Sequence, residues 1–335
     1  MEKKLTRGFI SFMIGIFFLS AAFITLSSNL MAAELWKPKD PIRVIVSSGV
    51  GSAYDILARK VSEYSVEYFG VPMIVSNSPG AGGLAAAEKI ASAKPDGRTV
   101  GFCSSNMHME AFFKVAEGQW NFSWKPEDLC TIFGIAAPPY VVVTGAQQPF
   151  KNWNDVRNHK GPIRIANTAP VAKCIPMVRD LLEHGVDVKV ANFKGTPQSR
   201  LAIESGDAHL WMGASSVSTV KPIEEGKMRP LYIYNDKRDS RFPDWPTHIE
   251  LGMPEKYQYN RMIRVYLTVP GTPQNILEGL HIGLRSIAED TRVVEWGKKI
   301  SLPTDPRSKE EVENHLKIQW KSIEDDMDLI KKYAG

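Results

Sequence analysis

The fold is decided by the stretch Pro41-Ile-Arg-Val-Ile-Val-Ser-Ser-Gly-Val-Gly-Ser-Ala-Tyr-Asp-Ile-Leu-Ala-Arg59. Its apolar run over 42–46 is typical of a buried strand of the parallel type. The loop that follows carries almost no side-chain bulk, and its two glycines let the backbone come close to a ligand. A helix starting near Tyr54 leaves first-turn N–H groups without helical partners, and such an end favours anions. This strand, loop and helix therefore predict a site for a carboxylate or a phosphate.

Residues 1–33 have the pattern of an export signal. Three basic residues precede an uncharged, mostly apolar run over 8–26, and small residues follow up to Ala33. We expect cleavage after Ala33 and a periplasmic mature protein. Because the apolar run is long for a signal, an uncleaved membrane anchor stays open as an alternative.

The mature chain keeps about 300 of the 335 residues, which is long for one core and predicts two lobes. Removing the signal lowers the net charge from +4 to +2, and no long basic stripe remains. We therefore expect no nucleic-acid partner. No later segment is apolar for long enough to span a bilayer.

The three cysteines, Cys103, Cys130 and Cys174, are too few for a disulfide framework. Their spacing predicts no metal site and no cofactor. One bridge between Cys103 and Cys130 stays open. No catalytic motif is present and the histidines form no pattern, so we expect a protein that is not an enzyme, with catalysis as a minor alternative.

Apolar runs and helical patterns alternate along the chain, which predicts an α/β fold with largely parallel sheets. The expected strands are 42–46, 72–76, 98–103, 140–144, 162–166, 188–193, 209–213, 230–234 and 264–269. The expected helices are 54–69, 82–93, 105–117, 153–159, 171–184, 197–205, 216–225, 274–290 and 308–332.

Two segments are candidate crossings between lobes: Pro138-Pro139 and Asn260-Arg261. If both cross, the first lobe holds 34–137 plus 262–335 and the second holds 138–261. Two such connections form a hinge, with the ligand closed between the lobes.

Seven motifs in order resemble the Bug-type periplasmic receptors of tripartite tricarboxylate transporters. They are the opening strand, loop and helix, Asn77-Ser-Pro-Gly-Ala-Gly-Gly83, Lys94-Pro-Asp-Gly-Arg-Thr99, Phe193-Lys-Gly-Thr196, Glu225-Gly-Lys-Met-Arg229, Phe242-Pro-Asp-Trp-Pro-Thr247 and Val269-Pro-Gly-Thr-Pro273. The likeness covers nearly the whole mature chain. It implies a two-lobed periplasmic binding protein of type II, the Venus-flytrap form, with a ligand cleft between the lobes.

The resemblance also implies a function: a monomeric receptor that binds a small organic acid and delivers it to membrane permease subunits. A receptor that presents its ligand to a sensor kinase is the alternative, because both roles use the same closure.

The residues expected to bind the ligand come from loops that precede helices, from strand ends in both lobes and from one strand beside the hinge. They are Ser48, Gly49, Gly51, Ser52, Ala53, Tyr54, Ser104, Ser105, Asn167, Thr168, Ala169, Phe193, Gly213, Ala214 and Arg264. Helix capping is the alternative role for Ser104 and Ser105.

The chain departs from the family pattern at several of these places. His209 and Gly213 stand where family members commonly have Asp, which weakens the case for an amine in the ligand. Arg264 could pair with a ligand carboxylate, or could form a surface ion pair. Pro170 and Lys173 also depart from the family loop, and Lys173 could contribute charge or be solvated.

We therefore expect the ligand to be a small organic anion without an essential amine. Three aromatic residues, Tyr54, Phe193 and Tyr266, could sandwich a ring of an aromatic ligand; the alternative is that they only pack the cleft walls.

Overall fold

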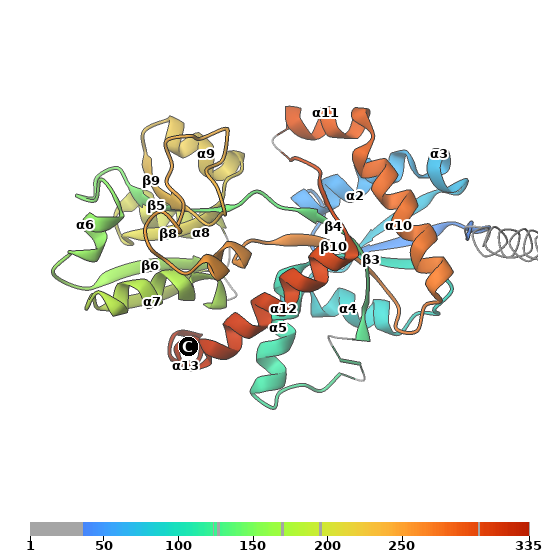
Figure 1. Ribbon diagram of the computed structural model, residues 1–335, viewed down its shortest axis with the longest axis horizontal. Coiled ribbons are helices and arrows are strands. Elements are labelled where there is room, and N and C mark those ends of the chain that lie inside the picture. The colour runs from blue at the N-terminus through green and yellow to red at the C-terminus, as the bar shows by residue number, and fades with distance from the viewer. Residues whose placement is uncertain are drawn as a thin grey trace, which may run out of the picture.

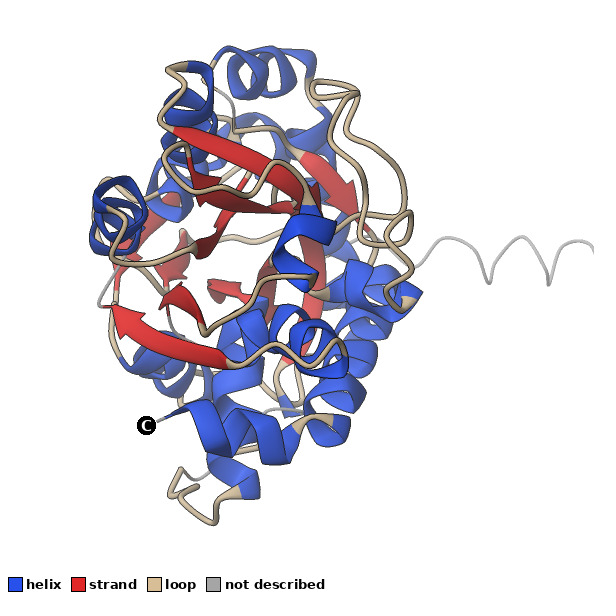
Figure 2. Cartoon of the chain, turned by 90° about the vertical axis from the view of Figure 1, so that its left-hand side faces the viewer, coloured by secondary structure: helices blue, strands red, loops and turns tan. Residues whose placement is uncertain are grey.

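The computed structural model describes residues 36–334, apart from 123, 126–127, 169–170, 194–195 and 301. The expected export signal lies outside the described residues. Figure 1 shows two lobes joined by extended segments. Each lobe has its own sheet with helices packed on it, and Figure 2 shows the helices surrounding the strands.

The first lobe is built on a six-stranded sheet. In spatial order its strands are β11 (Asp305–Arg307), β4 (Cys130–Ala136), β10 (Ile263–Thr268), β3 (Thr99–Ser104), β1 (Ile42–Val46) and β2 (Met73–Asn77). The helical elements that follow or cover these strands are α2 (Ala53–Glu63), α3 (Ser65–Phe69), η1 (Ala81–Gly83), α4 (Leu84–Ala91), α5 (Ser105–Ala116), α10 (Gln274–Glu289), α11 (Thr291–Lys299) and α12 (Lys309–Asp325).

The second lobe is built on a five-stranded sheet. In spatial order its strands are β7 (Val188–Phe193), β6 (Ile163–Thr168), β8 (Leu210–Ala214), β5 (Tyr140–Gly145) and β9 (Met228–Ile233). Its helical elements are α6 (Trp153–Arg157), η3 (Val171–Cys174), α7 (Ile175–Glu183), α8 (Thr196–Ser205), α9 (Val217–Glu224), η4 (Glu255–Tyr259) and, packed on it from the chain's end, α13 (Met327–Ala334).

Both sheets are mixed, so the expectation of largely parallel sheets is wrong. β1 pairs in parallel with β2 and β3, and β6 pairs in parallel with β7 and β8. The strands that enter a lobe from the other one run the opposite way: β10 is antiparallel to β3 and β4, and β5 is antiparallel to β8 and β9. The reversal follows from the topology, because a strand arriving from the facing sheet starts at the edge where its neighbours end.

The chain passes between the sheets three times. β4 leads into β5 through Ala137–Pro139, and the return path from η4 enters β10 through 260–262. The third passage is α12, which has Val312 in the core of the first lobe and Ile323 in that of the second. The division into lobes at 137/138 and 261/262 stays a prediction, and it did not include this contact of the C-terminal helices with the second lobe.

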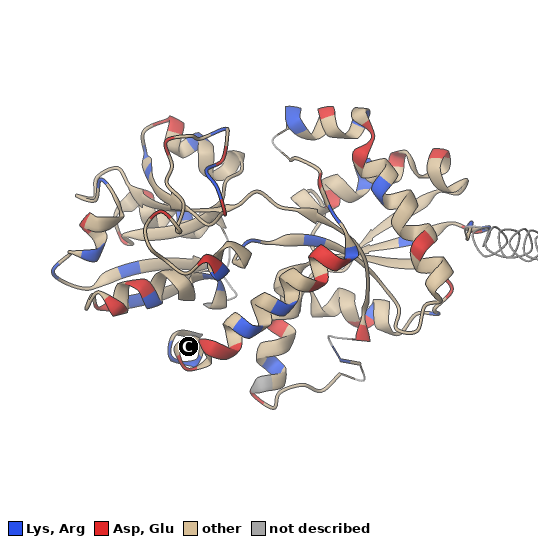
Figure 3. Ribbon diagram, viewed as in Figure 1, with Lys and Arg blue, Asp and Glu red and all other residues tan. Residues whose placement is uncertain are grey.

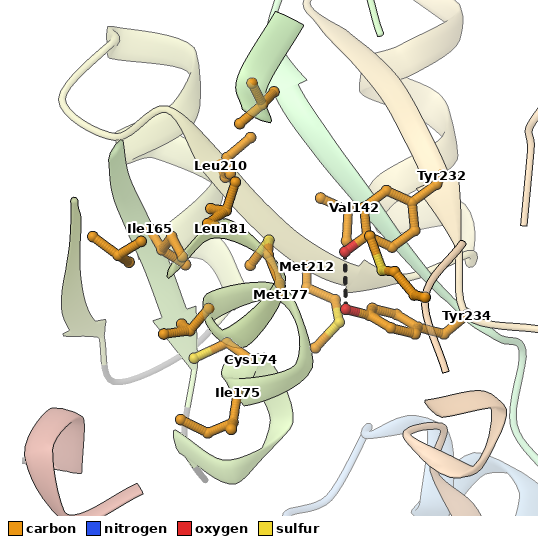
Figure 4. Close-up of a cluster of buried hydrophobic side chains, with 14 of the residues drawn as sticks. Val142, Ile165, Cys174, Ile175, Met177, Leu181, Leu210, Met212, Tyr232 and Tyr234 are labelled. Atoms are coloured by element: carbon orange, nitrogen blue, oxygen red, sulfur yellow. Dashed lines mark hydrogen bonds between the residues drawn. The ribbon is translucent and has the colours of Figure 1, made fainter. Parts of the chain in front are cut away.

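Each lobe has a dense aromatic and aliphatic core. In the second lobe the hydroxyl groups of Tyr232 and Tyr234 hydrogen-bond each other at 2.9 Å among buried aliphatic and sulfur-containing side chains (Figure 4). In the first lobe Tyr266 stacks on Phe102 with ring centroids 4.3 Å apart. These cores make each sheet a rigid platform for the loops at its edge.

Cys103, Cys130 and Cys174 are not joined by disulfide bonds. Cys103 lies on β3 and Cys130 on β4, and β10 runs between these two strands. Among the described residues, no helix is long and apolar enough to cross a membrane.

Candidate functional site

The predicted loops of the two lobes lie on sheet edges that face each other. Ser104, at the end of β3, pairs with Arg264, and Ala136, at the end of β4, pairs with Ile263. Four residues later the chain enters the second sheet at Tyr140, whose partner is Ala214 at the end of β8. Because parallel strands end at the same edge, the ends of β1, β3, β6 and β8 all border the space between the lobes.

In the first lobe, the β1–α2 loop presents hydroxyl and backbone N–H groups at this edge. The hydroxyl groups of Ser48 and Ser52 are 2.6 Å apart, and the Ser52 hydroxyl caps α2 by accepting a bond from the N–H of Asp55 at 3.2 Å. Ala53 is exposed, and among the described residues its N–H and that of Tyr54 have no hydrogen-bond acceptor. Those two groups are therefore open to an anion.

Asp55 braces this loop from inside, a role that the sequence analysis did not assign. One of its carboxylate oxygens accepts from the N–H of Gly51 at 2.9 Å, and the other accepts from Asn77 and Arg59. The side chain of Asn77 also donates to the carbonyl of Ser48 at 2.9 Å. These bonds lower the pKa of Asp55, with the bond from Arg59 as the largest cause. Since Asp55 already occupies the N–H of Gly51, that donor is not open to a ligand.

Arg264 is a buried cation without an acidic partner. The side chain is on β10 beside the hinge, only 2 % exposed, and its hydrogen bond to the described part of the chain runs from Nη1 to the carbonyl of Ala136 at 3.3 Å. Its Nε has no partner among the described residues, and no carboxylate lies within ion-pair distance there. The guanidinium lies 5.8 Å from the ring of Tyr54. The alternative of a surface ion pair for Arg264 is therefore wrong.

Several groups around Arg264 are polar and buried. The hydroxyl of Tyr54 is buried without a hydrogen bond of ordinary geometry. Burial is the main cause that raises the pKa values of Tyr54 and Tyr140, and the charge of Arg264 opposes it in both. A buried phenol beside a guanidinium whose Nε has no partner is costly in a protein interior unless a ligand or water completes their bonds.

The two predicted serines of the β3–α5 turn differ in their roles. Ser104 caps α5, because its hydroxyl accepts from the N–H of Asn106 at 3.1 Å. Ser105 is fully buried, and its hydroxyl accepts from the N–H of Ile263 at 3.1 Å. The hydroxyl of Ser105 therefore fastens the hinge strand to α5, and this bond makes its assignment to ligand binding unfavourable.

In the second lobe, Asn167 is buried at the end of β6. Its Nδ2 donates to Asn192 at 2.9 Å, while its Oδ1 is buried without a partner among the described residues. Thr168 pairs with Phe193 across β6 and β7, and Ala169 lies outside the described residues. Phe193 packs against the second core cluster of this lobe.

Gly213 and Ala214 end β8. A Cβ atom at Gly213 would lie 2.5 Å from Trp211 and 2.6 Å from the hydroxyl of Thr219. The absence of a side chain at Gly213 is therefore explained by packing within the lobe. Ala214 is half-buried and lies opposite Tyr140, at the edge that faces the first lobe.

Lys173 is a second buried cation, on η3 of the second lobe. Its side chain is 7 % exposed, and its ammonium lies 5.4 Å from the ring centroid of Tyr140. Within the described chain its ammonium has no hydrogen bond or ion pair, and burial lowers its pKa to about 8. Its backbone carbonyl accepts a bond from the side chain of Asn260 in the hinge at 2.6 Å. Lys173 is thus tied to the hinge and is not solvated at the surface.

The positions of His209 and Tyr266 remove the basis of two expectations about the ligand, one about an amine and one about an aromatic ring. His209 precedes β8, at the end of the strand away from the cleft, and its ring packs near Phe150 and His159. A lost Asp at 209 therefore says nothing about an amine in the ligand. Tyr266 is fully buried in the core of the first lobe, so it cannot sandwich a ring in the cleft, and that part of the aromatic expectation is wrong.

The charged residues of both signs are interspersed over the outside of the two lobes (Figure 3). Among the described residues there is no group of three or more His, Cys, Asp or Glu side chains that could hold a metal ion.

A hollow of about 820 Å³ also borders the hinge, between residues of both lobes on the side where β11 lies. Its lining includes Pro138, Pro139, Arg261 and Arg307. None of the residues predicted to bind the ligand lines it.

Comparisons with known proteins agree with this two-lobed architecture. The "UPF0065 protein in gbd 5'region" of Cupriavidus necator is 27 % identical over 222 residues, which cover 64 % of this chain and 65 % of that relative, just under two thirds of its length. A TctC solute-binding protein from Polaromonas, solved without ligand, is 19 % identical with a TM-score of 0.70 and covers 86 % of this chain and 99 % of its own. Rpa4515 of R. palustris, solved with adipate, is 19 % identical with a TM-score of 0.68 and covers 89 % and 98 %.

These neighbours confirm the predicted two-lobed α/β fold, and they are solute-binding receptors and not enzymes. The model of the tripartite tricarboxylate transporter family receptor, TctC, matches residues 57–323, which is most of the chain. This chain therefore belongs to the TctC family, the Bug-type solute-binding receptors of tripartite tricarboxylate transporters.

Proposed function

We propose that this protein is an extracytoplasmic receptor that binds a small organic carboxylate in the cleft between its lobes and delivers it to membrane permease subunits. It acts as a monomer in the periplasm after removal of residues 1–33. The family membership supports the receptor role, and a relative of the same fold holds a dicarboxylate, adipate. Mass spectrometry of the exported protein should find an N-terminus near Glu34; a full-length, membrane-retained protein would contradict the cleavage.

The observation that carries the ligand class is the isolated charge of Arg264. A buried guanidinium without a carboxylate partner is strongly unfavourable, and it cannot discharge itself by losing its proton. Such a group is retained where another molecule brings the counter-charge. A carboxylate fits best, because its two oxygens match the guanidinium fork and its single negative charge is permanent at neutral pH.

The β1–α2 loop would hold the same ligand from the other side. The N–H groups of Ala53 and Tyr54 lie at the positive end of α2, and the hydroxyl groups of Ser48 and Ser52 stand beside them. In this arrangement Arg264 supplies the opposite charge, and the N–H and hydroxyl groups of the loop orient the carboxylate of the ligand. No group in it selects for an amine.

The proposal is tested by isothermal titration calorimetry of the mature chain against aliphatic and aromatic carboxylic acids, with amino acids and neutral sugars as competitors. Arg264→Gln should weaken binding of the best acid about 10- to 100-fold, because a charge-assisted bond is lost. Arg43→Gln is the matched control: Arg43 lies in the same sheet, at the far end of β1, with its side chain exposed. Equal affinity of the wild type and Arg264→Gln for every acid that binds would overturn the assignment.

A second variant tests the loop. Ala53→Trp should abolish binding by blocking the approach to the two N–H groups, while the capping bonds of Ser52 and Asp55 remain. Tight binding of an amino acid or a sugar by the wild type, with none of any carboxylate, would contradict the proposed ligand class.

A further inference from the structure

We propose that the hollow on the β11 side of the hinge is a second binding site, for a small oxyanion such as phosphate, and that an anion bound there opposes closure of the cleft. This site is separate from the carboxylate site of the proposed function. It makes the receptor respond to a second solute through the hinge that both sites share.

The hollow and the cleft lie on opposite sides of the strands that cross between the lobes. In the first sheet the crossing strands β4 and β10 have β11 on one side and β3 and β1 on the other. In the second sheet β5 has β9 on one side and β8 and β6 on the other. The loops expected to bind the ligand follow β1, β3, β6 and β8, whereas β11 and residues 235–237, which follow β9, line the hollow. A hinge rotation that narrows the cleft therefore widens the hollow.

Arg261, on the return crossing, is the residue of the hollow that most favours an anion. Its side chain lines the hollow and is half-buried, and Nη1 donates to the amide oxygen of Asn235 at 3.3 Å. Within the described chain it makes no ion pair. Burial and the charge of Arg307 lower its pKa, yet a guanidinium stays charged at neutral pH. Arg261 is therefore a cation held in a cavity beside a second cation, without a carboxylate in contact.

Arg307 and Lys237 extend the positive lining into both lobes. Arg307 pairs with Asp305 through Nη2 and with Glu311 through Nη1, while its Nε is buried without a partner among the described residues. Lys237 reaches the hollow from the second lobe, is exposed and pairs with no acid in the described chain. The hollow thus offers one unpaired guanidinium, one free guanidinium N–H and one free ammonium.

The other charges of the lining do not cancel this surplus. Arg241 pairs with Asp239 at 2.5 Å, and Lys298 pairs with Glu295 at 2.8 Å. Asp236 is exposed and is the lining carboxylate without an ion pair to a described residue. One unpaired acid against two unpaired cations leaves the hollow positive.

An oxyanion fits these groups by geometry as well as by charge. Two of its oxygens match the fork of Arg261, and phosphate has further oxygens for the Nε of Arg307 and the ammonium of Lys237. These cations come from the hinge and from both lobes, so an anion that binds all three holds the lobes together on this side. A hollow held narrow keeps the cleft open. Because such coupling is reciprocal, the anion weakens the binding of the cleft ligand.

The first test is calorimetry of the mature chain at pH 7 with inorganic phosphate alone, at constant ionic strength. The wild type should bind one phosphate with a Kd of about 1 mM or lower. Arg261→Gln and Lys237→Gln should each weaken it about 10-fold. Arg238→Gln is the matched control and should change nothing, because Arg238 lies outside the lining and pairs with Glu250 at 2.8 Å. Arg264→Gln should retain phosphate binding, since Arg264 belongs to the cleft.

The second test measures the affinity of the best acid of the calorimetric series with and without saturating phosphate. In the wild type phosphate should weaken the acid about 3- to 10-fold. In Arg261→Gln the same phosphate concentration should have no effect on the acid. Chloride at equal ionic strength controls for screening and should leave the acid affinity unchanged.

The outcomes separate the second site from the proposed function. No phosphate binding by the folded wild type, or binding lost in Arg264→Gln and kept in both Arg261→Gln and Lys237→Gln, would overturn the second site. An acid affinity that phosphate leaves unchanged, or lowers equally in Arg261→Gln, would overturn the coupling, and the latter result would show direct competition in the cleft. If no acid binds but phosphate binds through Arg261, the proposed function fails and the second site stands.

Discussion

Removing the charge of Lys173 should make the ligand-free protein more stable. A buried ammonium without a carboxylate lowers the free energy of unfolding, because the unfolded chain solvates it fully. Its pKa falls from the usual 10.5 to about 8. Each unit corresponds to about 1.4 kcal/mol, so the charge costs about 3 kcal/mol at pH 7.

Lys173→Met keeps most of the apolar length of the side chain and loses the contact of the ammonium with the ring of Tyr140, which contributes about 1 kcal/mol. The net expectation is a gain of about 2 kcal/mol in the free energy of unfolding. For a chain of this size that corresponds to a rise of about 4 °C in Tm. Differential scanning calorimetry without ligand measures it, with Lys256→Met, which removes a lysine paired with Asp325, as the control that should not gain.

The gain should depend on pH with a definite sign. The folded protein releases the Lys173 proton near pH 8, whereas the unfolded chain keeps it up to about 10.5, so the contribution of Lys173 to wild-type stability rises with pH between these values. The advantage of Lys173→Met should therefore shrink by about half between pH 7 and pH 9.5. Burial raises the pKa values of the neighbouring Cys174, to about 12, and Tyr140, so neither titrates in this range. An unchanged or lower Tm at pH 7, or a gain independent of pH, would refute the reasoning.

Other side chains give sharp expectations of the same kind. Gly213→Ala should destabilise the second lobe by about 1–3 kcal/mol in urea unfolding, because the new Cβ would collide with Trp211 and Thr219; a stable variant would contradict this. Tyr266→Phe removes a buried hydroxyl without a partner among the described residues and should leave ligand affinity unchanged in calorimetry. A loss of affinity would show that Tyr266 contacts the ligand. Asp55→Asn should raise the Kd about 10-fold by loosening the loop, with near-native Tm, and an unchanged Kd would show that the loop needs no brace.

Much of the fold could be predicted because strongly apolar, β-branched runs have few alternatives. The expected strand at 42–46 matches β1, and that at 188–193 matches β7. The structure adds β4, β11 and α11, which the sequence analysis did not anticipate. β11 has only three residues, Asp-Pro-Arg, so its strand geometry comes from pairing with β4 and not from its own pattern.

The site was harder to predict because the same residue type can lie either at the cleft or in the core. Ser105 and Tyr266 looked like cleft residues by position, yet the hydroxyl of Ser105 holds the hinge strand and the ring of Tyr266 lies in the core. Tyr266 lies on the same face of β10 as Arg264 but further from the hinge, where Phe102 and Phe133 pack on it, and Ser105 begins a helix. A position near the cleft therefore does not determine exposure to it. Conversely, the burial of Lys173 depends on Tyr140 and the hinge, which are distant in sequence.

The hinge itself links the charge of the cleft to the motion of the lobes. Asn260 donates to the carbonyl of Lys173, and the next residue, Arg261, offers its carbonyl to Gln319 of α12 at 3.1 Å. The far end of α12 is held to the second lobe by an ion pair between Arg179 and Asp326. A rotation of the lobes therefore has to pass through this short segment, where the η3 backbone, the returning strand and the long helix meet.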